Sequence, residues 1–384
     1  MMTMCQKKFK IINKMMTRKN RPEALYIHIP FCQKICDYCD FTKLQYFRNF
    51  AEPYLEALEK ELDSYNINHK LKTIYIGGGT PTALDDDLFK RLLSIVDKYR
   101  EGVEEYTIEC NPESLSEAKL KMMKTHGVTR LSIGVESTND EILRAIGRNH
   151  TFQDVQTAVL NAKKNGFDNI NVDLIIGLPN AYKEILKQDL ENVLGLDVQH
   201  ISCYSLTVHP NTKFFINKIE EPSGDFAREL YDVVEVTLKE SGFVHYEISN
   251  WAKSGYESKH NYVYWKDETY YGMGLGASGY IKNKRYVNTK NITKYLNGEF
   301  IDSEEDVSLE DDKTYFIMLN LRTKRGLLFK EYEERFGEDF YKKFEEKIME
   351  LEKSHLLDVH SDKIVATYEG MMILDKIIME FIEE

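Results

Sequence analysis

The sequence has few cysteines, no long uncharged hydrophobic run and no excess of positive charge. Six cysteines in 384 residues are too few for a disulfide-rich secreted fold. Because no stretch of about 18 uncharged apolar residues is present, we predict no transmembrane segment and at most peripheral contact with a membrane. The formal net charge of -12 gives non-specific nucleic-acid binding no driving force over most of the surface. We therefore predict a soluble, cytoplasmic protein without a nucleic-acid partner.

Residues 1–21 form a basic N-terminal tail with seven Lys or Arg side chains and no acidic one. The tail lacks the unbroken apolar core of a secretory signal, so export is not expected. Met15 and Met16 leave two readings open: a functional basic arm, or a native translation start downstream of Met1. The rest of the chain has the balance of a folded protein, with 42% hydrophobic and 30% charged residues. Its length allows two or three domains.

From residue 25 onward, short β-rich runs alternate with segments of helical period, which is typical of parallel βα units. The predicted strands are 25–29, 73–77, 106–110, 130–134, 169–175 and 200–206. The predicted helices between them are 53–65, 85–99, 116–126, 151–165 and 181–194. Six such units suit either a partial, open (β/α)6 barrel or a doubly wound sheet. Both α/β folds bind ligands at the carboxyl ends of their strands.

The alternation of strand-like and helix-like segments stops after residue 210, so we predict that the barrel spans residues 22–210. A mixed α+β extension follows at 211–303 and includes a predicted helix at 224–242. A mainly helical C-terminal domain follows at 304–384, with a hairpin near residues 357–367.

Three cysteines, Cys32, Cys36 and Cys39, lie in the loop that follows the first predicted strand. Three thiols suit an iron–sulfur cluster or zinc. A structural zinc site would need a fourth Cys or His, and none follows at the usual spacing. We therefore predict a 4Fe-4S cluster with one open iron, which the amino and carboxylate groups of a ligand can chelate.

Chemically conspicuous residues end the later strands. The segment 77–82, Gly-Gly-Gly-Thr-Pro-Thr, follows the second strand, and its glycines let the backbone approach a ligand closely. Glu109 ends the third strand, where a carboxylate can accept hydrogen bonds from ribose hydroxyls. Arg148 suits a carboxylate partner, and Asp173 suits hydroxyls or a cation. The alternative is that Arg148 and Asp173 form a salt bridge with each other.

The C-x3-C-x2-C spacing, preceded by Tyr26-Ile-His-Ile-Pro-Phe, resembles the radical S-adenosylmethionine superfamily, and specifically its coproporphyrinogen-dehydrogenase-like group. The resemblance extends over residues 22–384. In that superfamily a reduced cluster donates an electron to the sulfonium of S-adenosylmethionine and releases a deoxyadenosyl radical. The resemblance therefore implies a one-electron donor such as flavodoxin or ferredoxin as a partner.

The resemblance also assigns cofactor contacts. It implies that the backbone around Gly78 and Gly79 meets the amino group of S-adenosylmethionine and that Glu109 binds the ribose. The family usually has glutamine at Glu136, so a hydrogen bond donated from that position is lost unless Glu136 is protonated. The residues to which it assigns contact with S-adenosylmethionine are Tyr26, Tyr38, Gly78, Gly79, Thr80, Glu109, Glu136, Arg148, Asp173 and Leu206.

Two branches of the group differ in function. In the oxygen-independent coproporphyrinogen III oxidases the triad continues as C-x-C, whereas this chain has Phe41 at that position and a short arm before Tyr26. Both differences resemble the heme-chaperone branch. We therefore expect a protein that binds heme as cargo and transfers it to heme-acceptor proteins. The alternative is an enzyme that oxidatively decarboxylates coproporphyrinogen, and a structural zinc protein is a distant third class.

A second motif supports the heme-chaperone branch. His260-Asn-Tyr-Val-Tyr-Trp265 matches the H-N-x-x-Y-W signature of that branch. A histidine beside several aromatic rings could ligate heme iron while the rings pack on the porphyrin. The alternative is a buried histidine with protein partners only. Ser278 stands where the family commonly has histidine, so a ligand carried over to that place is lost.

Overall fold

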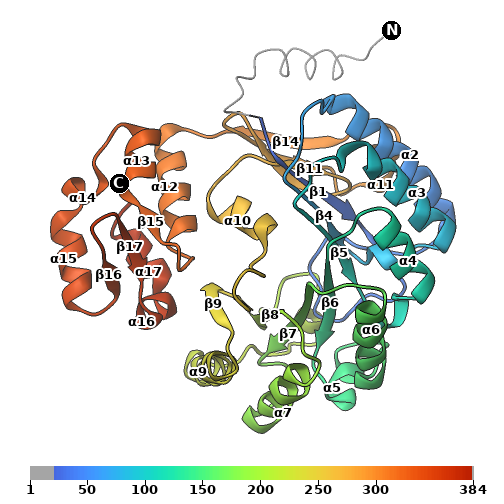
Figure 1. Cartoon of the computed structure of the whole chain (residues 1–384), viewed down its shortest axis with the longest axis horizontal. Coiled ribbons are helices and arrows are strands. Elements are labelled where there is room, and N and C mark those ends of the chain that lie inside the picture. The colour runs from blue at the N-terminus through green and yellow to red at the C-terminus, as the bar shows by residue number, and fades with distance from the viewer. Residues whose placement is uncertain (1–20, 383–384) are drawn as a thin grey trace.

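The computed structural model describes residues 21–382, so the predicted basic tail lies outside the described residues except for Arg21. A curved nine-stranded sheet forms the centre of the molecule, with strand order β11-β1-β4-β5-β6-β7-β8-β10-β9. Figure 1 shows helices covering the outer side of this sheet and a smaller C-terminal lobe beside it. The sheet therefore has one face toward helices and one toward the interior of the molecule.

Six parallel strands stand in chain order in the middle of this sheet. They are β1 (Ala24–Ile29), β4 (Thr73–Gly78), β5 (Glu105–Cys110), β6 (Arg130–Glu136), β7 (Ile170–Ile176) and β8 (His200–Ser205). Each one confirms a predicted strand to within two residues. A doubly wound sheet requires the strand order to reverse at a switch point. Since the order here never reverses, the doubly wound alternative is wrong and the partial, open barrel is confirmed.

The helices that connect these strands begin with suitable caps. Thr151 forms a capping box with Asp154 at the start of α6, and Ser116 accepts a hydrogen bond from the backbone of Lys119 at the start of α4. Apolar side chains of these helices pack against the outer face of the sheet in one continuous core. The helices on this face include α2 (Arg48–Tyr65), α3 (Asp86–Val96), α4 (Glu117–Thr125), α5 (Asp140–Ala145), α6 (Phe152–Lys164), α7 (Lys183–Leu194) and α9 (Gly224–Glu240).

Both edges of the sheet are supplied by residues beyond 210. Strand β11 (Tyr271–Met273) lies parallel to β1, while β10 (Asn250–Ala252) is antiparallel to β8 and pairs with β9 (Val244–Glu247). Tyr271 and Tyr295 belong to the same core as the barrel strands. The boundary predicted near 210 therefore does not separate two hydrophobic cores. Beside β11 lie α11 (Ile292–Leu296) and an antiparallel sheet of β12 (Ser278–Ile281), β13 (Lys284–Asn288) and β14 (Ile301–Asp306).

The C-terminal lobe has its own core, in which Phe340 is fully buried. Its hairpin of β16 (Leu357–Val359) and β17 (Lys363–Ala366) confirms the one predicted near 357–367. The other elements are α12 (Leu309–Asn320), β15 (Leu327–Leu328), α13 (Phe329–Phe336), α14 (Phe340–Lys343), α15 (Glu345–Lys353), α16 (Tyr368–Met372) and α17 (Leu374–Met379).

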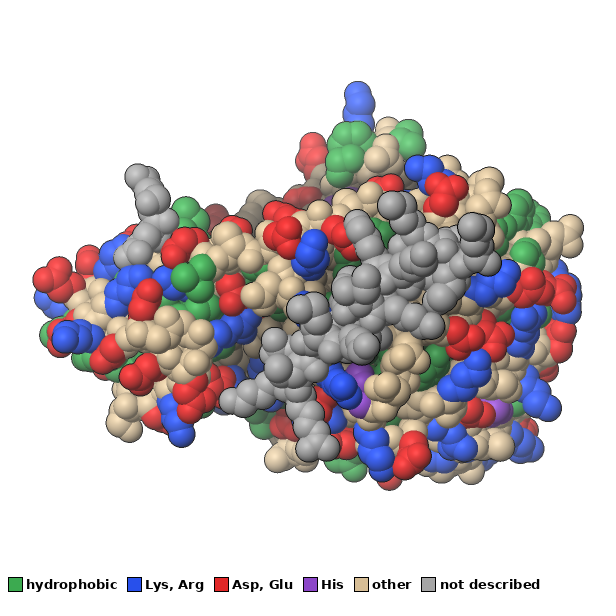
Figure 2. Space-filling view, turned by 90° about the horizontal axis from the view of Figure 1, so that it is seen from above, with side chains coloured by type: hydrophobic (Ala, Val, Ile, Leu, Met, Phe, Trp, Pro, Cys, Tyr) green, Lys and Arg blue, Asp and Glu red, His purple; other side chains and the backbone are tan. Residues whose placement is uncertain are grey.

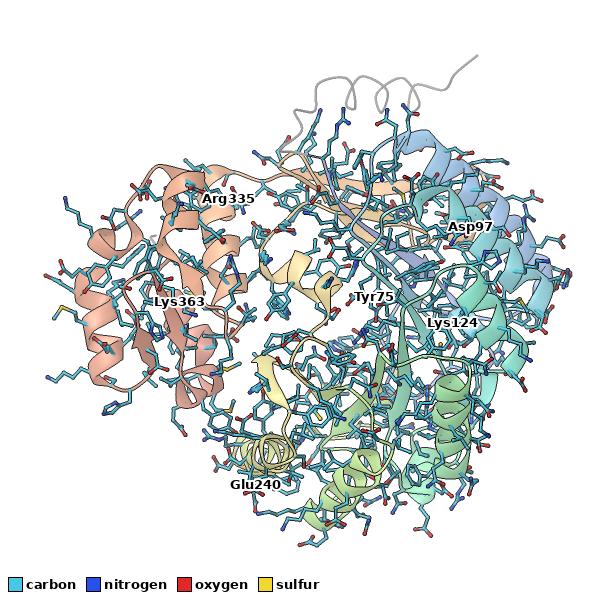
Figure 3. The ribbon with its side chains drawn as sticks, viewed as in Figure 1. Tyr75, Asp97, Lys124, Glu240, Arg335 and Lys363 are labelled. Carbon is cyan, nitrogen blue, oxygen red and sulfur yellow. The ribbon has the colours of Figure 1, made fainter. Side chains whose placement is uncertain are left out.

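Ion pairs attach the C-terminal lobe to the rest of the molecule. Arg335, labelled in Figure 3, contacts the buried carboxylate of Asp267 at 2.8 Å, and Arg285 contacts the same carboxylate at 2.8 Å. Removing Asp267 would leave two guanidinium groups without this shared partner.

The surface carries charges of both signs. On the face that Figure 2 shows, outside the grey atoms, acidic and basic side chains are intermingled. Within residues 21–382, no helix combines the length and apolar character needed to cross a bilayer.

Candidate functional site

A cavity of about 470 Å³ opens at the carboxyl ends of the parallel strands. Ends of parallel strands meet at one edge of a sheet, so residues far apart in the sequence come together there. All of the predicted cofactor and metal residues line this cavity except Tyr26 and His260. The lining members are Cys32, Cys36, Tyr38, Cys39, Gly78, Gly79, Thr80, Glu109, Glu136, Arg148, Asp173 and Leu206.

The cysteine loop follows β2 (Phe31–Cys32), which pairs with β3 (Leu44–Gln45). The Cys32 thiol is buried and lies 3.9 Å from the Thr80 hydroxyl, and burial raises the pKa of Cys32 to about 12. Cys36 Sγ accepts a hydrogen bond from Arg148 Nη1 at 3.5 Å. All three thiols are free and face the same cavity. No group of three or more His, Cys, Asp or Glu within residues 21–382 converges on a single metal ion, whereas the thiolates of a cluster site each ligate a different iron.

Backbone and apolar contacts hold the cysteine loop on the barrel. The Asp37 amide donates to the carbonyl of Ile146 at 3.1 Å, and the Phe214 amide of α8 (Lys213–Ile216) donates to the carbonyl of Asp37 at 3.0 Å. The rings of Tyr38 and Phe214 pack edge to face, 6.2 Å apart. Tyr38 and Leu206 belong to a small apolar cluster under this loop. These contacts attach the loop to the barrel.

The glycine loop at the end of β4 packs its backbone closely against Pro30, which follows β1, and against Glu109 of β5. A Cβ on Gly79 would lie 2.7 Å from the carbonyl carbon of Pro30, and one on Gly77 would lie 2.7 Å from Cδ of Glu109. Only glycine fits at position 79, where the contacts are backbone atoms, whereas a Cβ at position 77 would displace the Glu109 carboxylate. This close packing lets the Gly78 amide donate to Glu109 Oε2 at 2.8 Å.

Glu109 presents its carboxylate to the cavity between two protein donors. Tyr75 donates a hydrogen bond to Oε1 at 2.8 Å, and Gly78 occupies the other oxygen. A carboxylate offers about four acceptor positions, so about two remain for a ligand. Burial raises the pKa of Glu109 to about 7, against the opposing effect of these hydrogen bonds.

Arg148 and Glu136 form another part of the cavity wall. The Arg148 guanidinium is buried and donates from Nη2 to the Gly134 carbonyl at 2.6 Å and to Asn111 Oδ1 at 3.1 Å. Its Nε is buried and has no hydrogen-bond partner among the described residues. A buried donor without a partner costs stability unless a ligand satisfies it. This wall therefore suits an anionic or carbonyl group of a bound molecule.

Glu136 has an unusual backbone for a non-glycine residue, with φ of 66° at the end of β6. A register shift between Gly134 and Glu136 accompanies it. The Glu136 carboxylate lies 3.8 Å from Arg148 Nη2. Burial raises the pKa of Glu136, and the nearby Arg148 opposes that rise. The strained backbone places this carboxyl at the cavity, as is common at functional sites.

Asp173 lies on β7 and takes part in a polar network on the inner face of the sheet. It accepts hydrogen bonds from Ser132 at 3.1 Å and from Asn171 at 2.8 Å. Burial raises the pKa of Asp173. The contacts of Arg148 are with Cys36, Asn111, Gly134 and Glu136, so the alternative of an Arg148–Asp173 salt bridge is wrong.

Two predicted cofactor residues, Tyr26 and His260, are not among the residues that line the cavity. Tyr26 OH is 2.9 Å from His28 Nδ1, and His28 Nε2 is 2.7 Å from the carbonyl of Thr42, so this pair supports the end of the cysteine loop. His260, on α10 (Lys259–Trp265), is 1% exposed. Its Nδ1 lies 2.8 Å from Thr73 Oγ1 and its Nε2 lies 2.9 Å from Tyr264 OH. Both ring nitrogens are thus engaged, and the structure does not bring His260 to the site.

His260 instead contacts Tyr75, a cavity residue that was not predicted from the sequence. Its ring packs against that of Tyr75 at 5.2 Å between centroids, and Tyr75 holds Glu109. Figure 3 labels Tyr75, a residue of β4, near the middle of the molecule. The sequence signal that could have identified Tyr75 is the two-residue repeat of a β-strand, which places Tyr75 on the same face of the sheet as Gly77. Other missed lining residues are Asn111, Ser132, Tyr204 and His209.

The donor set as a whole fits an iron–sulfur cluster with a nucleoside that carries an amino acid. Three thiols are the soft ligands that iron in such clusters takes. The partnerless Nε of Arg148 suits a carboxylate, and the remaining acceptor positions of Glu109 suit sugar hydroxyls. The exposed backbone at Gly78 and Gly79 completes a polar cradle for such a ligand.

Comparisons with known proteins agree with this chemistry. Residues 26–193 match the radical SAM superfamily, and residues 307–373 match the HemN C-terminal domain. The chain is 38% identical over 371 residues to the heme chaperone HemW of Lactococcus lactis, covering 94% of this chain and 98% of that protein. It is 36% identical over 379 residues to the heme chaperone HemW of Bacillus subtilis, covering 94% and 100%.

A solved structure shares the fold over nearly the whole chain. The coproporphyrinogen III oxidase HemN of Escherichia coli is similar with a TM-score of 0.84, covering 98% of this chain and 93% of that one. The two sequences are 24% identical. The two proteins therefore share one fold, which includes both the partial barrel and the C-terminal lobe.

Proposed function

Because the chain belongs to the HemW family of the radical SAM superfamily, we propose that it binds heme and transfers it to acceptor proteins. The observation that carries this proposal is the likeness to proteins named heme chaperones over 94% of the chain. The family also implies a 4Fe-4S cluster and S-adenosylmethionine. The cavity at the strand ends has the thiols and polar groups to hold both.

Cys32, Cys36 and Cys39 are the residues that would hold the cluster. When bound and reduced, a cluster of this kind supplies one electron to S-adenosylmethionine. A flavodoxin or ferredoxin type of donor would provide that electron. Arg148 donates to the sulfur of Cys36, and hydrogen bonds to such sulfurs tune the reduction potential.

The cavity walls would orient S-adenosylmethionine. The backbone at Gly78, Gly79 and Thr80 faces the place of the amino group, and Arg148 would pair with the carboxylate. Glu109 would accept the ribose hydroxyls, with Tyr75 fixing the orientation of its carboxylate. Asp173, Glu136, Tyr38 and Leu206 line the remaining walls.

Replacing Glu109 with glutamine is expected to weaken S-adenosylmethionine binding by about 10- to 100-fold. The amide keeps the size of the side chain but replaces an acceptor oxygen with a donor, and hydrogen bonds to a charged group contribute about 1.5–3 kcal/mol. Tyr75→Phe leaves the carboxylate in place and is expected to have a smaller effect. Calorimetry on the cluster-loaded chain under anaerobic conditions measures both. An unchanged Kd for Glu109→Gln would exclude the ribose assignment.

The competing reading, oxidative decarboxylation of coproporphyrinogen, is supported by the common fold alone. Phe41 occupies the position at which that branch has a further cysteine. Phe41 is 63% exposed and lines the cavity. A large exposed apolar ring at this place suits contact with a bound molecule better than a role as a cluster ligand.

Heme transfer from the loaded chain tests the proposed function. The full chain, with its cluster, would be loaded with one equivalent of heme and mixed with apo-forms of heme proteins from the source cell. Passive loss of heme would be measured in parallel with an excess of a heme-scavenging apo-globin. We expect at least one acceptor to take heme faster than this passive loss. Failure of the chain to bind heme, or equal rates for every acceptor, would overturn the proposal.

A further inference from the structure

Asn111 lines the cavity directly after β5, and its side-chain amide contacts three polar groups. Its Oδ1 accepts a hydrogen bond from Arg148 Nη2 at 3.1 Å. Its Nδ2 donates to Thr80 Oγ1 at 3.3 Å and to Glu113 Oε1 at 3.3 Å. One amide thus links Arg148 to the glycine loop and to a carboxylate.

The backbone fixes Asn111 in this position. Its amide N–H donates to Thr82 Oγ1 at 3.4 Å. Its carbonyl accepts hydrogen bonds from the amide and from the hydroxyl of Ser114, both at 3.1 Å. Because both backbone groups are engaged, the side chain is held at the cavity wall.

The hydrogen bonds of Arg148 leave its charge unpaired. Two of them go to neutral oxygens, those of the Gly134 carbonyl at 2.6 Å and of the Asn111 amide, and a third goes to Cys36 Sγ. Among residues 21–382, the only carboxylate within 4.0 Å of the guanidinium is that of Glu136, at 3.8 Å. A guanidinium without a hydrogen-bonded protein carboxylate keeps its strongest partnership for a ligand.

A carboxylate that could compete for Arg148 lies on the other side of the Asn111 amide. Burial raises the pKa of Glu113, but the hydrogen bond with His150 and the charge of Arg148 outweigh burial and hold this pKa below its usual value. Glu113 is therefore an anion at neutral pH, with its Oε2 3.5 Å from His150 Nδ1. Opposite charges attract more strongly near a protein interior than in water. The amide stands between the two groups, with its oxygen toward Arg148 and its nitrogen toward Glu113.

We propose that Asn111 is a positioning residue that keeps Arg148 apart from Glu113 and so reserves the guanidinium for the carboxylate of S-adenosylmethionine. An amide suits this role because it accepts and donates at once. A carboxylate at this position could not donate to Thr80 or Glu113, and an apolar side chain could do neither. The inference rests on the proposed function in that the chain binds S-adenosylmethionine.

The affinity for S-adenosylmethionine relative to that for its decarboxylated analogue tests this role. The analogue keeps the nucleoside, the sulfonium and the amine, so the dissociation constant of the analogue divided by that of S-adenosylmethionine reports on the carboxylate. Calorimetry on the cluster-loaded chain under anaerobic conditions measures both constants. We expect Asn111→Asp, which adds an anion beside Arg148, to reduce this ratio by about tenfold. Asn217→Asp, at the exposed end of α8, is the matched control and should keep the ratio.

A second pair of variants separates charge from packing. Asn111→Ala is expected to reduce the ratio because Glu113 can then approach Arg148, and adding Glu113→Gln is expected to restore most of it. If Asn111 only supported the fold, both ligands would weaken equally. An unchanged ratio in Asn111→Asp, or no recovery in the double variant, would overturn the role of Asn111 while cofactor binding would stand. A wild-type chain that binds neither ligand would overturn the proposed cofactor itself.

Discussion

Replacing any one of Cys32, Cys36 and Cys39 with alanine is expected to abolish stable binding of the 4Fe-4S cluster. The site supplies only three thiolates, so each loss leaves a second iron without a protein ligand. Iron content is expected to fall from about four atoms per chain to near zero, with the visible absorption of the cluster. Iron and sulfide assays after anaerobic reconstitution measure this directly.

The chain offers a matched control for the cysteine variants. Cys203 is free, 1% exposed and outside the cavity lining. Cys203→Ala is expected to keep the full iron content, at a small cost in stability from the lost packing. Wild-type iron in Cys36→Ala, or loss of iron in Cys203→Ala, would contradict the assignment of the three ligands.

Replacing Glu61 with alanine is expected to lower the free energy of unfolding by about 3–5 kcal/mol. Glu61 lies on α2 and is fully buried. It accepts hydrogen bonds from the Gly274 amide at 2.8 Å, from Asn288 Nδ2 at 2.6 Å and from Tyr295 OH at 2.6 Å. Alanine would remove this acceptor from the Gly274 amide and the Tyr295 hydroxyl, would leave Asn288 Nδ2 with only the Gly274 carbonyl, and would leave a cavity beside β11.

Denaturant unfolding measures the effect of Glu61→Ala, and Glu52→Ala is its control. Glu52 is exposed on the same helix, so its loss is expected to change the free energy of unfolding by no more than about 0.5 kcal/mol. Equal stabilities for the Glu61 and Glu52 variants would show that this network does not anchor the edge of the sheet.

The stability that depends on Glu61 should also vary with pH. Burial raises the pKa of Glu61 to about 7, although its three hydrogen bonds oppose that rise. In the unfolded chain the carboxyl titrates near 4.3. Because the folded state holds the proton more tightly, this contribution is full below about pH 4.3 and is lost as the pH rises through about 7. The stability difference between wild type and Glu61→Ala should therefore shrink between pH 5 and pH 8, and a growing difference would contradict this.

Much of the barrel could be predicted because its strands carry strong local signals. The six parallel strands are buried apolar runs, and their order in the sheet follows the order in the chain. The same regularity explains why many of the predicted site residues meet, since Gly78, Glu109 and Glu136 lie at the carboxyl ends of neighbouring strands of one parallel sheet. The edge strands could not be predicted in this way. Strand β11 has only three residues and gains its stability from pairing with β1.

Side-chain environments were harder to predict than strand positions. His260 lies among aromatic residues, and that pattern is equally typical of a metal ligand and of a buried structural residue. Its partners Thr73 and Tyr264 are set by the packing of α10 on β4. The positive φ of Glu136 likewise depends on a register shift that no local sequence pattern indicates. Tertiary packing decides such features, and a single sequence does not reveal it.

The proposed function is tested most directly by an anaerobic assay that measures both heme transfer and coproporphyrinogen oxidation by the same chain. The cluster-loaded protein would be incubated with coproporphyrinogen III, S-adenosylmethionine and a low-potential reductant, and heme transfer to an acceptor would be measured on the same preparation. The coproporphyrinogen III oxidase of Escherichia coli serves as the positive control for the first reaction. We predict heme transfer without formation of protoporphyrinogen. Steady production of protoporphyrinogen by this chain would contradict the proposed function.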